Sequence, residues 1–402
     1  MSSNHAVTTS RLAAPVIVLS GGGSGGHLTP ILSLAHALKK QSPDCRVIYI
    51  GIKGEKLPDL IKSSPAIDQV FRVSAGKWRR YHGRSLVAKL LNPTTLLLNI
   101  RDSFRVLAGS LQAYRLLGRI NPSVVFSKGG YGAVPVGVAA KWRHLPIVTH
   151  DSDSLPGLAN RLIGRWAVIH ATGQADGDYP YPAASIRHTG IPVNQKLKPV
   201  TAQAQQLFKQ QLKIPSGQPV ILVGGAGLGS RTLNQLMISS AASLLTQHPK
   251  LHILHLTGKD HLSACRQAYG SQLTADVRRR LHLADFTNDF QAWSGAADLI
   301  VTRAGATTLA ELAVQHKACI VIPAPWLAEG HQTRNAQKLQ AAGAAAVADN
   351  HISANDFISL INRLLADPKR RQALADKLGA LAKPEAADQL ASLILNSAQI
   401  PR

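Results

Sequence analysis

The stretch Gly21-Gly22-Gly23-Ser24-Gly25-Gly26-His27-Leu28-Thr29-Pro30 decides the fold of the first half of the chain. An apolar, largely β-branched run (15–19) precedes it, and apolar residues recur at helical spacing in 31–38. This order predicts a buried parallel strand, a glycine-rich turn and a helix. Glycines at five of the six positions 21–26 leave backbone N–H groups and the positive helix end open to an anion. We therefore expect a phosphate-bearing ligand at this turn.

Two common nucleotide-binding motifs fit this turn poorly. The dinucleotide pattern G-x-G-x-x-G matches Gly21, Gly23 and Gly26, but it also needs an acid at the end of the second strand. That strand, 46–50, runs instead into the sequence Gly-Ile-Lys-Gly at 51–54. The triphosphatase loop needs a Gly-Lys-Ser/Thr, which does not follow. His27 either acts chemically beside the anion or caps the helix, and both interpretations stay open.

Composition indicates a cytosolic α/β protein with two domains. A chain of 402 residues with 45% hydrophobic residues can form two cores. No apolar run approaches the roughly 18 residues of a membrane span, and 12–19 is interpreted as the first strand rather than a signal-peptide core. The three cysteines and the scattered histidines lack the spacing of a disulfide framework or a metal site. We expect no metal and no cofactor.

The charge balance predicts an acidic partner. Lys and Arg number 45 against 22 Asp and Glu, a formal net charge of +23. Nucleic acid, an anionic membrane surface and a phosphorylated substrate all fit this charge, and charge alone does not choose among them.

The chain repeats its opening pattern about two hundred residues later. Alternating strands and longer segments in the first half predict a parallel sheet with crossover helices. After a polar stretch, the strand 219–223 runs into a second glycine loop (224–230) and a helix. We therefore expect an α/β fold of two Rossmann-like, doubly wound domains with a cleft between them. The expected parts are a flexible tail (1–13), an N-terminal domain (14–195), a C-terminal domain (196–380) and a C-terminal helix (381–402) that can pack back on the N-terminal domain.

The segment 77–119 departs from this rhythm. It carries nine cations against the single acid Asp102, interleaved with large apolar residues. Such a mixture suits the headgroup region of an anionic bilayer, and we expect membrane contact for 78–100. For 103–117 the simpler interpretation is an amphipathic crossover helix with its leucine face in the core. The expected membrane patch consists of Trp78, Arg79, Arg80, Leu86, Leu90, Leu91, Leu97 and Leu98.

A second constellation follows the strand at 299–301. The sequence Thr-Arg-Ala-Gly-Ala-Thr-Thr-Leu-Ala-Glu at 302–311 predicts a strand end, a glycine turn and a helix start that presents free N–H groups to a phosphate. Glu311, about one turn into the helix, is either an acceptor for two hydroxyls of a ribose or an exposed helix carboxylate. Amide side chains in 329–335, at the next strand end, can bind sugar hydroxyls.

Taken together, these motifs resemble the MurG-type glycosyltransferases over most of the chain, from about Val16 to beyond Ala344. The resemblance implies a GT-B fold, no metal, and inverting transfer of N-acetylglucosamine from UDP-N-acetylglucosamine to undecaprenyl-pyrophosphoryl-N-acetylmuramoyl-pentapeptide (lipid I to lipid II). It also implies a peripheral protein on the cytoplasmic side of the cell membrane, bound to the anionic inner leaflet and not to nucleic acid. The residues that carry it are Gly22 to His27 with Pro30, Lys128 to Tyr131 with Pro135, His150-Asp151 with Gly157 and Asn160, Gly190 to Val193, Gly224-Gly225 with Arg231, Arg303 to Glu311, and His331-Gln332 with Asn335.

The resemblance assigns roles at the matching positions. The catalytic residues would be His27 and Asp151. The acceptor would lie against Gly22, Gly23, Gly129, Gly130 and Tyr131. The UDP-sugar donor would contact Ser24, Gly25, Gly26, Asp153, Asn194, Ala226, Thr287, Arg303, Ala306, Thr307, Thr308, Leu309, Ala310, Glu311, His331, Gln332 and Asn335.

Several positions depart from the family pattern. The family usually has Asn at Asp153, Arg at Asn194 and Ser at Ala226, and its acid after the histidine is longer than Asp151. The missing arginine removes a cation expected near the diphosphate. Arg231 or Arg303 could take its place.

The expected reaction needs a base for the acceptor hydroxyl and a holder for the departing diphosphate. His27 is the first candidate for the base, and Asp151 is either a second candidate or the partner that orients His27. Three alternatives remain at this stage: a GT-B transferase acting on another lipid, a nicotinamide-dependent oxidoreductase, and a non-enzymatic protein that binds membranes or nucleic acid.

Overall fold

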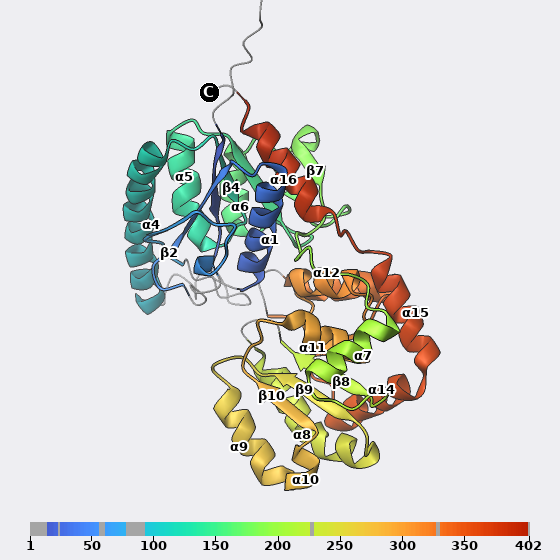
Figure 1. The fold of residues 1–402 in the computed structure, drawn as a ribbon. Helices are drawn as coiled ribbons and strands as arrows, with labels where there is room; N and C mark the ends of the chain where they lie inside the picture. The colour runs from blue at the N-terminus through green and yellow to red at the C-terminus, as the bar shows by residue number, and fades with distance from the viewer. Residues whose placement is uncertain are drawn as a thin grey trace, which may run out of the picture.

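The computed structural model describes residues 14–22, 25–55, 61–77, 93–225, 229–326 and 330–400, with the side chains of 93–95 left aside. They form two parallel α/β domains, one above the other in Figure 1. The sequence prediction of two Rossmann-like sheets in a GT-B arrangement is thereby confirmed. Ser24, Gly23, Ala226 and most of the expected membrane patch lie outside the described residues.

The N-terminal sheet has seven parallel strands in the order β3-β2-β1-β4-β5-β6-β7. Its strands are β1 Val16–Ser20, β2 Arg46–Ile52, β3 Gln69–Val73, β4 Val124–Ser127, β5 Ile147–Asp151, β6 Ile169–Thr172 and β7 Ile186–His188. Its helices are α1 Gly25–Gln41, α4 Pro93–Ile120, α5 Val134–Trp142 and α6 Leu158–Ile163, with 3-10 turns η1 Tyr131–Ala133, η2 Gly164–Trp166 and η3 Ala183–Ser185.

The C-terminal sheet has six parallel strands in the order β10-β9-β8-β11-β12-β13. Its strands are β8 Val220–Gly224, β9 His252–Leu256, β10 Leu281–Ala284, β11 Leu299–Thr302, β12 Cys319–Val321 and β13 Ala346–Val347. Its helices are α7 Ala202–Gln211, α8 Arg231–Gln247, α9 Leu262–Gln272, α10 Ala275–Arg278, α11 Phe290–Ala296, α12 Ala306–Val314, α13 His331–Ala341, α14 Ala354–Ala366 and α15 Pro368–Gly379, followed by α16 Ala386–Ser397.

The strand orders explain why the glycine turns matter. The chain order reverses between β1 and β4 in one sheet and between β8 and β11 in the other. At such a point the connections leave in opposite directions and open a crevice at the carboxyl ends of the strands. The turn after β1 lies at one crevice, and the start of α12, just after β11, lies at the other.

The last helix returns to the first domain. Figure 1 shows α16 alongside α1, and its residues Leu390 and Ile394 belong to the same buried cluster as Leu34 and Leu38 of α1. Asp388 bonds Lys40 Nζ at 3.1 Å and Gln195 Nε2 at 2.8 Å. Helix α16 thus links the end of the chain to the N-terminal core.

The described ranges contain neither a membrane-spanning helix nor a cluster of metal-binding side chains. None of their helices is both long and apolar enough to cross a bilayer. Nor do they bring together three or more His, Cys, Asp or Glu side chains in a way that could hold a metal ion.

Buried histidines make the fold sensitive to acid. His255 donates from Nε2 to Asn234 Oδ1, because the Asn234 amide is itself oriented by its bond to Thr257 O, and its Nδ1 accepts from the Tyr269 hydroxyl. His150 Nε2 lies 2.9 Å from Gly190 O. Burial is the main reason that the pKa of each imidazole falls to about 3. Both histidines are therefore neutral in the folded protein at pH 7.

We expect the free energy of unfolding to fall as the pH drops below about 6.5, the pKa of histidine in the unfolded chain. Below that pH the unfolded chain binds protons at these two positions, whereas His150 and His255 stay neutral in the folded protein. Their contribution to the free energy of unfolding is therefore present in full above about pH 6.5 and is lost as the pH falls toward 3. Between pH 6.5 and 4.5 the two sites together cost on the order of 5 kcal/mol. Urea denaturation at several pH values measures this slope. His255→Gln should flatten it and exposed His351→Gln should not; a pH-independent stability would contradict the prediction.

Candidate functional site

The two domains meet at the starts of two helices. Thr307 at the start of α12 donates its hydroxyl to Gly26 O at the start of α1, at 3.1 Å. Asn335 Nδ2 bonds Asp153 Oδ1 across the same gap at 3.0 Å, and Figure 1 shows α12 beside the lower end of α1. Two positive helix ends and the carboxyl ends of two sheets therefore border one cleft. Such a cleft suits a ligand with several negative charges.

Two glycine loops of the N-terminal domain pack against each other in this cleft. A Cβ atom at Gly130 would lie 2.3 Å from Gly22 O, so no side chain fits there. Gly129 and Gly130 also have φ values of 86° and 78°, which favour glycine. The structure thus brings together the predicted acceptor residues Gly22, Gly129 and Gly130, and Tyr131 begins the next turn.

His27 stands in the first turn of α1, beside the second glycine loop. Burial is the largest cause, and nearby Lys128 the second, of a pKa lowered to about 4. Its Nδ1 atom is buried and has no hydrogen-bond partner among the described residues. The imidazole is therefore neutral at pH 7, and no described group is hydrogen-bonded to Nδ1. Its role as the base stays a prediction.

A buried charge network lies beneath His27. Lys128 Nζ donates to Ser152 Oγ at 2.9 Å, and burial lowers its pKa to about 8 against the opposing effects of Asp151 and Asp153. Asp151 accepts from Asn160 Nδ2 and from the Tyr181 hydroxyl, both at 2.9 Å. Its two carboxylate oxygens are thus each bonded by another side chain.

The hypothesis that Asp151 orients His27 is therefore wrong for this conformation, since no hydrogen bond joins the two among the described residues. Asp151 instead balances the charge of buried Lys128, and burial raises its own pKa. Sequence reasoning gave no role to Lys128, Asn160 or Tyr181. Lys128 and Asn160 belong to the motifs that carry the family resemblance, so the sequence did single them out. No motif near Tyr181 indicates a function.

The C-terminal wall is the start of α12. A Cβ atom placed at Gly305, the residue before the helix, would meet nothing within 4 Å, so this helix start faces open space. Leu309 and Ala310 pack their side chains against the hydrophobic core, which leaves only their backbone for a ligand. Burial raises the pKa of Glu311, one turn in, to about 8. The expectation of an exposed carboxylate is wrong, and Glu311 is a partly desolvated group.

The amide side chains near α13 are already hydrogen-bonded within the protein. Gln332 Oε1 accepts from Ala324 N at 3.1 Å, which leaves its NH₂ group for other partners. Asn335 Nδ2 also donates to Ala304 O, while its Oδ1 is buried and has no partner among the described residues. His331 begins α13 beside them. Thr287 follows β10 at the carboxyl edge, where its hydroxyl accepts from Asp289 N.

The comparisons with known proteins cover nearly the whole chain. Residues 17–169 match the glycosyltransferase family 28 N-terminal domain and 220–390 match the family 28 C-terminal domain. A protein of Desulforudis audaxviator (strain MP104C) is 31% identical over 385 residues, which cover 94% of this chain and 97% of the relative. One of Tolumonas auensis is 33% identical, with the same coverage. Both are named UDP-N-acetylglucosamine--N-acetylmuramyl-(pentapeptide) pyrophosphoryl-undecaprenol N-acetylglucosamine transferase.

The chain belongs to the MurG family of glycosyltransferases. The crystal structure of Acinetobacter baumannii MurG superposes with a TM-score of 0.66 at 24% identity, and the match covers 95% of this chain and 99% of that one. A UDP-GlcNAc 2-epimerase from Neisseria meningitidis bound to UDP-GlcNAc has a TM-score of 0.63 at 13% identity. At such identities these structures establish a shared fold and no more.

Members of the MurG family usually have an arginine at the position of Asn194, so another residue of this chain would have to supply that positive charge. The guanidinium of Arg303 donates to Ser230 Oγ, Asn350 Oδ1 and the carbonyls of Ile322 and Pro323. Burial lowers its pKa to about 10. Asn194, where the family usually has the arginine, is exposed and accepts from Lys196 N. Of the Arg303 guanidinium, only the Nη2 atom has no partner among the described residues, so a contact of Arg303 with the diphosphate stays a prediction for that atom alone.

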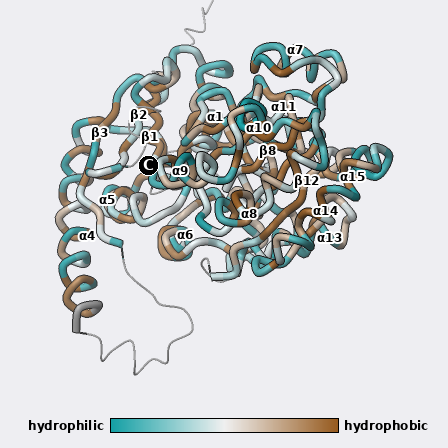
Figure 2. The backbone as a smooth tube through the Cα atoms, turned by 90° about the horizontal axis from the view of Figure 1, so that it is seen from below, coloured by the Kyte–Doolittle hydropathy of each residue, from teal (hydrophilic) through white to brown (hydrophobic). Residues whose placement is uncertain are grey.

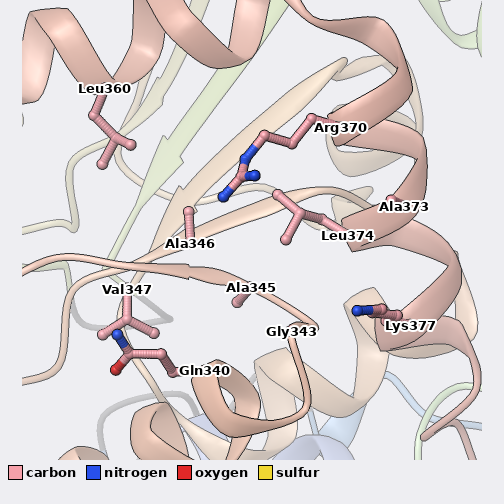
Figure 3. A pocket seen from close by; sticks show the side chains of 10 residues that line it. All are labelled: Gln340, Gly343, Ala345, Ala346, Val347, Leu360, Arg370, Ala373, Leu374 and Lys377. Carbon is pink, nitrogen blue, oxygen red and sulfur yellow. The ribbon is translucent and has the colours of Figure 1, made fainter.

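A separate hollow lies away from this MurG-type cleft. It has a volume of about 390 Å³ and is bordered by α13, β13, α14 and α15. Figure 3 shows Arg370, Leu374 and Lys377 extending from α15 toward the strand that carries Ala346. No residue predicted for donor, acceptor or catalysis lines it. The cleft between the domains therefore remains the candidate site.

Helix α4 fits the amphipathic crossover interpretation of 103–117 only in part. Ala113 and Leu117 lie in the core, whereas Phe104, Leu107 and Leu111 are exposed. The buried face carries Asp102, Gly109, Ala113 and Leu117, and α4 comes so close to Ser74 that Gly109 has no room for a side chain. Figure 2 shows brown, hydrophobic segments along the free side of α4. We define the α4 stripe as its exposed residues Leu97, Ile100, Phe104, Leu107, Leu111 and Tyr114.

Proposed function

We infer that this protein transfers N-acetylglucosamine from UDP-N-acetylglucosamine to undecaprenyl-pyrophosphoryl-N-acetylmuramoyl-pentapeptide, converting lipid I to lipid II. One observation carries this inference: relatives named for that transferase align with 94% of the chain at 31% and 33% identity. The facing helix starts and the paired glycine loops are compatible with a cleft for two pyrophosphate-bearing substrates. The alternatives from other classes have no comparable support.

The proposed chemistry is an in-line displacement at C1 of the donor sugar. The acceptor hydroxyl gives its proton to His27 Nδ1 as its oxygen bonds to C1, and the bond from C1 to the diphosphate oxygen breaks. UDP leaves with that electron pair, and the configuration at C1 inverts. The start of α12 at Ala306, Thr307 and Thr308 stabilises the departing charge through its N–H groups and dipole. Glu311 accepts the ribose hydroxyls of the donor.

Donor and acceptor are assigned to opposite walls. Gln332, His331, Asn335 and Thr287 would contact the sugar and uracil of the donor from the C-terminal side. Gly129, Gly130 and Tyr131 would contact the acceptor from the N-terminal side. The bond between Asn335 and Asp153 joins these walls, so Asp153 is placed to respond to both substrates.

The decisive experiment is a UDP-release assay with UDP-N-acetylglucosamine, with and without the pyrophosphoryl-lipid acceptor. We expect UDP release that depends on the acceptor and a product heavier by one N-acetylhexosamine. Side-by-side assays with diacylglycerol and with lipid I separate the two lipid-acceptor hypotheses. Transfer to diacylglycerol alone, or no UDP release with either lipid, would refute the proposed function.

We also propose that the protein binds the cytoplasmic leaflet of the cell membrane through the N-terminal domain. The α4 stripe supports this, because its residues recur every three or four positions on one exposed face, and Phe104 and Leu97 are 68% and 67% exposed. Exposed Arg101 and Arg105 flank it, each also paired with Asp102. Apolar residues flanked by cations suit an anionic bilayer surface. The docked domain would then present the acceptor loops to a lipid-borne substrate.

Phe104→Ser should weaken binding to vesicles containing phosphatidylglycerol by about tenfold or more, because burying such a side chain contributes about 1.5–3 kcal/mol. Co-sedimentation with vesicles measures the change, and added salt should weaken binding further. Leu207→Ser is the control, since Leu207 is also a largely exposed apolar residue, at 59%, but lies on α7 of the other domain. Equal loss in both variants would argue against the α4 stripe.

A further inference from the structure

Glu55, three residues after β2, lies against the first glycine turn. A Cβ atom built on Gly22 would lie only 2.6 Å from Glu55 Oε1. A Cβ atom built on Gly51 would lie 2.7 Å from Glu55 Oε2. The carboxyl group thus fills the slot left by two missing side chains. Nothing in the sequence analysis or in the comparisons gives Glu55 a role.

Tyr49 connects this carboxyl group to the backbone of the turn. The ring is fully buried in β2, and its hydroxyl lies 2.9 Å from Gly21 O and 2.8 Å from Glu55 Oε1. A phenol has one proton and cannot donate it to both oxygens at once. A protonated Glu55 resolves this conflict, because it donates to the phenol oxygen while the phenol donates to Gly21 O. Burial raises the pKa of Glu55, against the opposing effects of the Tyr49 hydrogen bond and of Arg72.

The turn held in this way leads directly to the acceptor loop. A Cβ atom on Gly130 would lie 2.3 Å from Gly22 O, so the backbones of the two glycine loops pack directly against each other. Tyr131, at the end of the second loop, has a raised pKa, chiefly because of burial and then because of the charge that Glu55 carries once it is ionised. Among the described residues, Arg72 is a charged group that lowers the pKa of Glu55. All of these residues belong to the N-terminal domain.

We propose that Glu55 is a positioning residue for the acceptor: with Tyr49 it fixes the Gly21–Gly22 backbone and, through it, the loop of Gly129 and Gly130. Glu55 itself need not touch the reacting atoms. This inference rests on the proposed function, in which these loops bind the pyrophosphate of the lipid acceptor. Glu55 and Tyr49 would then help to determine how the acceptor binds, through contacts that lie entirely within the N-terminal domain.

The test separates the two substrates in steady-state kinetics. Glu55→Ala empties the slot, and Tyr49→Phe removes the bond to Gly21 O. Each should raise KM for the lipid acceptor about tenfold, the effect of one lost hydrogen bond of ordinary strength, with KM for UDP-N-acetylglucosamine unchanged. Glu55→Gln keeps the shape and can donate from its amide, so it should remain within about twofold of the wild type. The acceptor KM of the double variant should not exceed that of the more impaired single variant, because both substitutions break the same chain of contacts.

Asp44→Ala is the matched control, since Asp44 is an exposed acid just before the same strand. A purely structural role for Glu55 would lower the melting temperature and raise both KM values together, and Glu55→Gln would then rescue neither. That result, or an unchanged acceptor KM in Glu55→Ala, overturns the proposal. A wild-type protein that transfers no sugar to the lipid acceptor refutes the proposed function instead, so the two failures are distinguishable.

Discussion

Replacing His27 by alanine should lower kcat about a thousandfold while KM for UDP-N-acetylglucosamine changes less than about twofold. The imidazole stands in the first turn of α1, Nδ1 has no partner among the described residues, and its low pKa keeps it neutral. A pKa of about 4 also makes a free imidazole a weak base. Bound diphosphate brings negative charge beside it, and this charge raises the pKa when both substrates are in place.

The UDP-release assay measures this loss, and His36→Ala is the control because His36 lies on the exposed side of the same helix. The loss of kcat/KM in acid should begin well below pH 6.5 in the wild type, because kcat/KM reports the free protein, in which the pKa of His27 is lowered. An His27→Ala variant with unchanged turnover would remove His27 from the mechanism. A rise in donor KM without a loss of kcat would instead make it a binding residue.

Replacing Glu311 by alanine should raise KM for the donor by about a hundredfold or more. Two hydrogen bonds from ribose hydroxyls to a carboxylate contribute about 1.5–3 kcal/mol each, and both are lost. Kinetics over a wide range of donor concentration measure the change, and exposed Glu385→Ala is the control. A donor KM unaffected by Glu311→Ala would exclude the proposed ribose contact.

The raised pKa of Glu311 should make donor affinity depend on pH, and affinity should increase as the carboxyl group ionises. Only the ionised carboxylate accepts both hydroxyls, and below pH 8 the free protein holds this group largely protonated. Donor affinity should therefore rise about tenfold per pH unit up to about pH 8 and then level off. Glu311→Gln should abolish this slope. Calorimetry in buffers of different ionisation enthalpy should also detect protons released on donor binding.

Much of the fold followed from local sequence patterns. The glycine stretch after a β-branched run predicted the β1 turn and α1, and its recurrence after Val220–Val223 predicted a second domain; both are confirmed. These features are readable because strand and helix periods are properties of consecutive residues. The ordered motifs likewise identified the family that the curated relatives confirm.

The functions of individual side chains were less readable. Arg303, one of two candidates for holding the diphosphate, donates to protein oxygens. The leucine face of α4 was expected in the core, yet Phe104, Leu107 and Leu111 are exposed. An arginine can bind a ligand or protein oxygens, and an apolar side chain can be buried or exposed. Which of these occurs depends on residues that lie far away in the sequence.

The sequence by itself determined the two-sheet architecture, the glycine turns at the strand ends and the family. Only the tertiary structure decided that Lys128 is buried near Asp151 and Asp153, and that the Glu55 carboxyl group packs against Gly22 beside Tyr49. The physical reason is that a glycine or an apolar run restricts its own backbone. The charge state and hydrogen bonds of a buried polar group depend instead on neighbours that only the folded chain brings together.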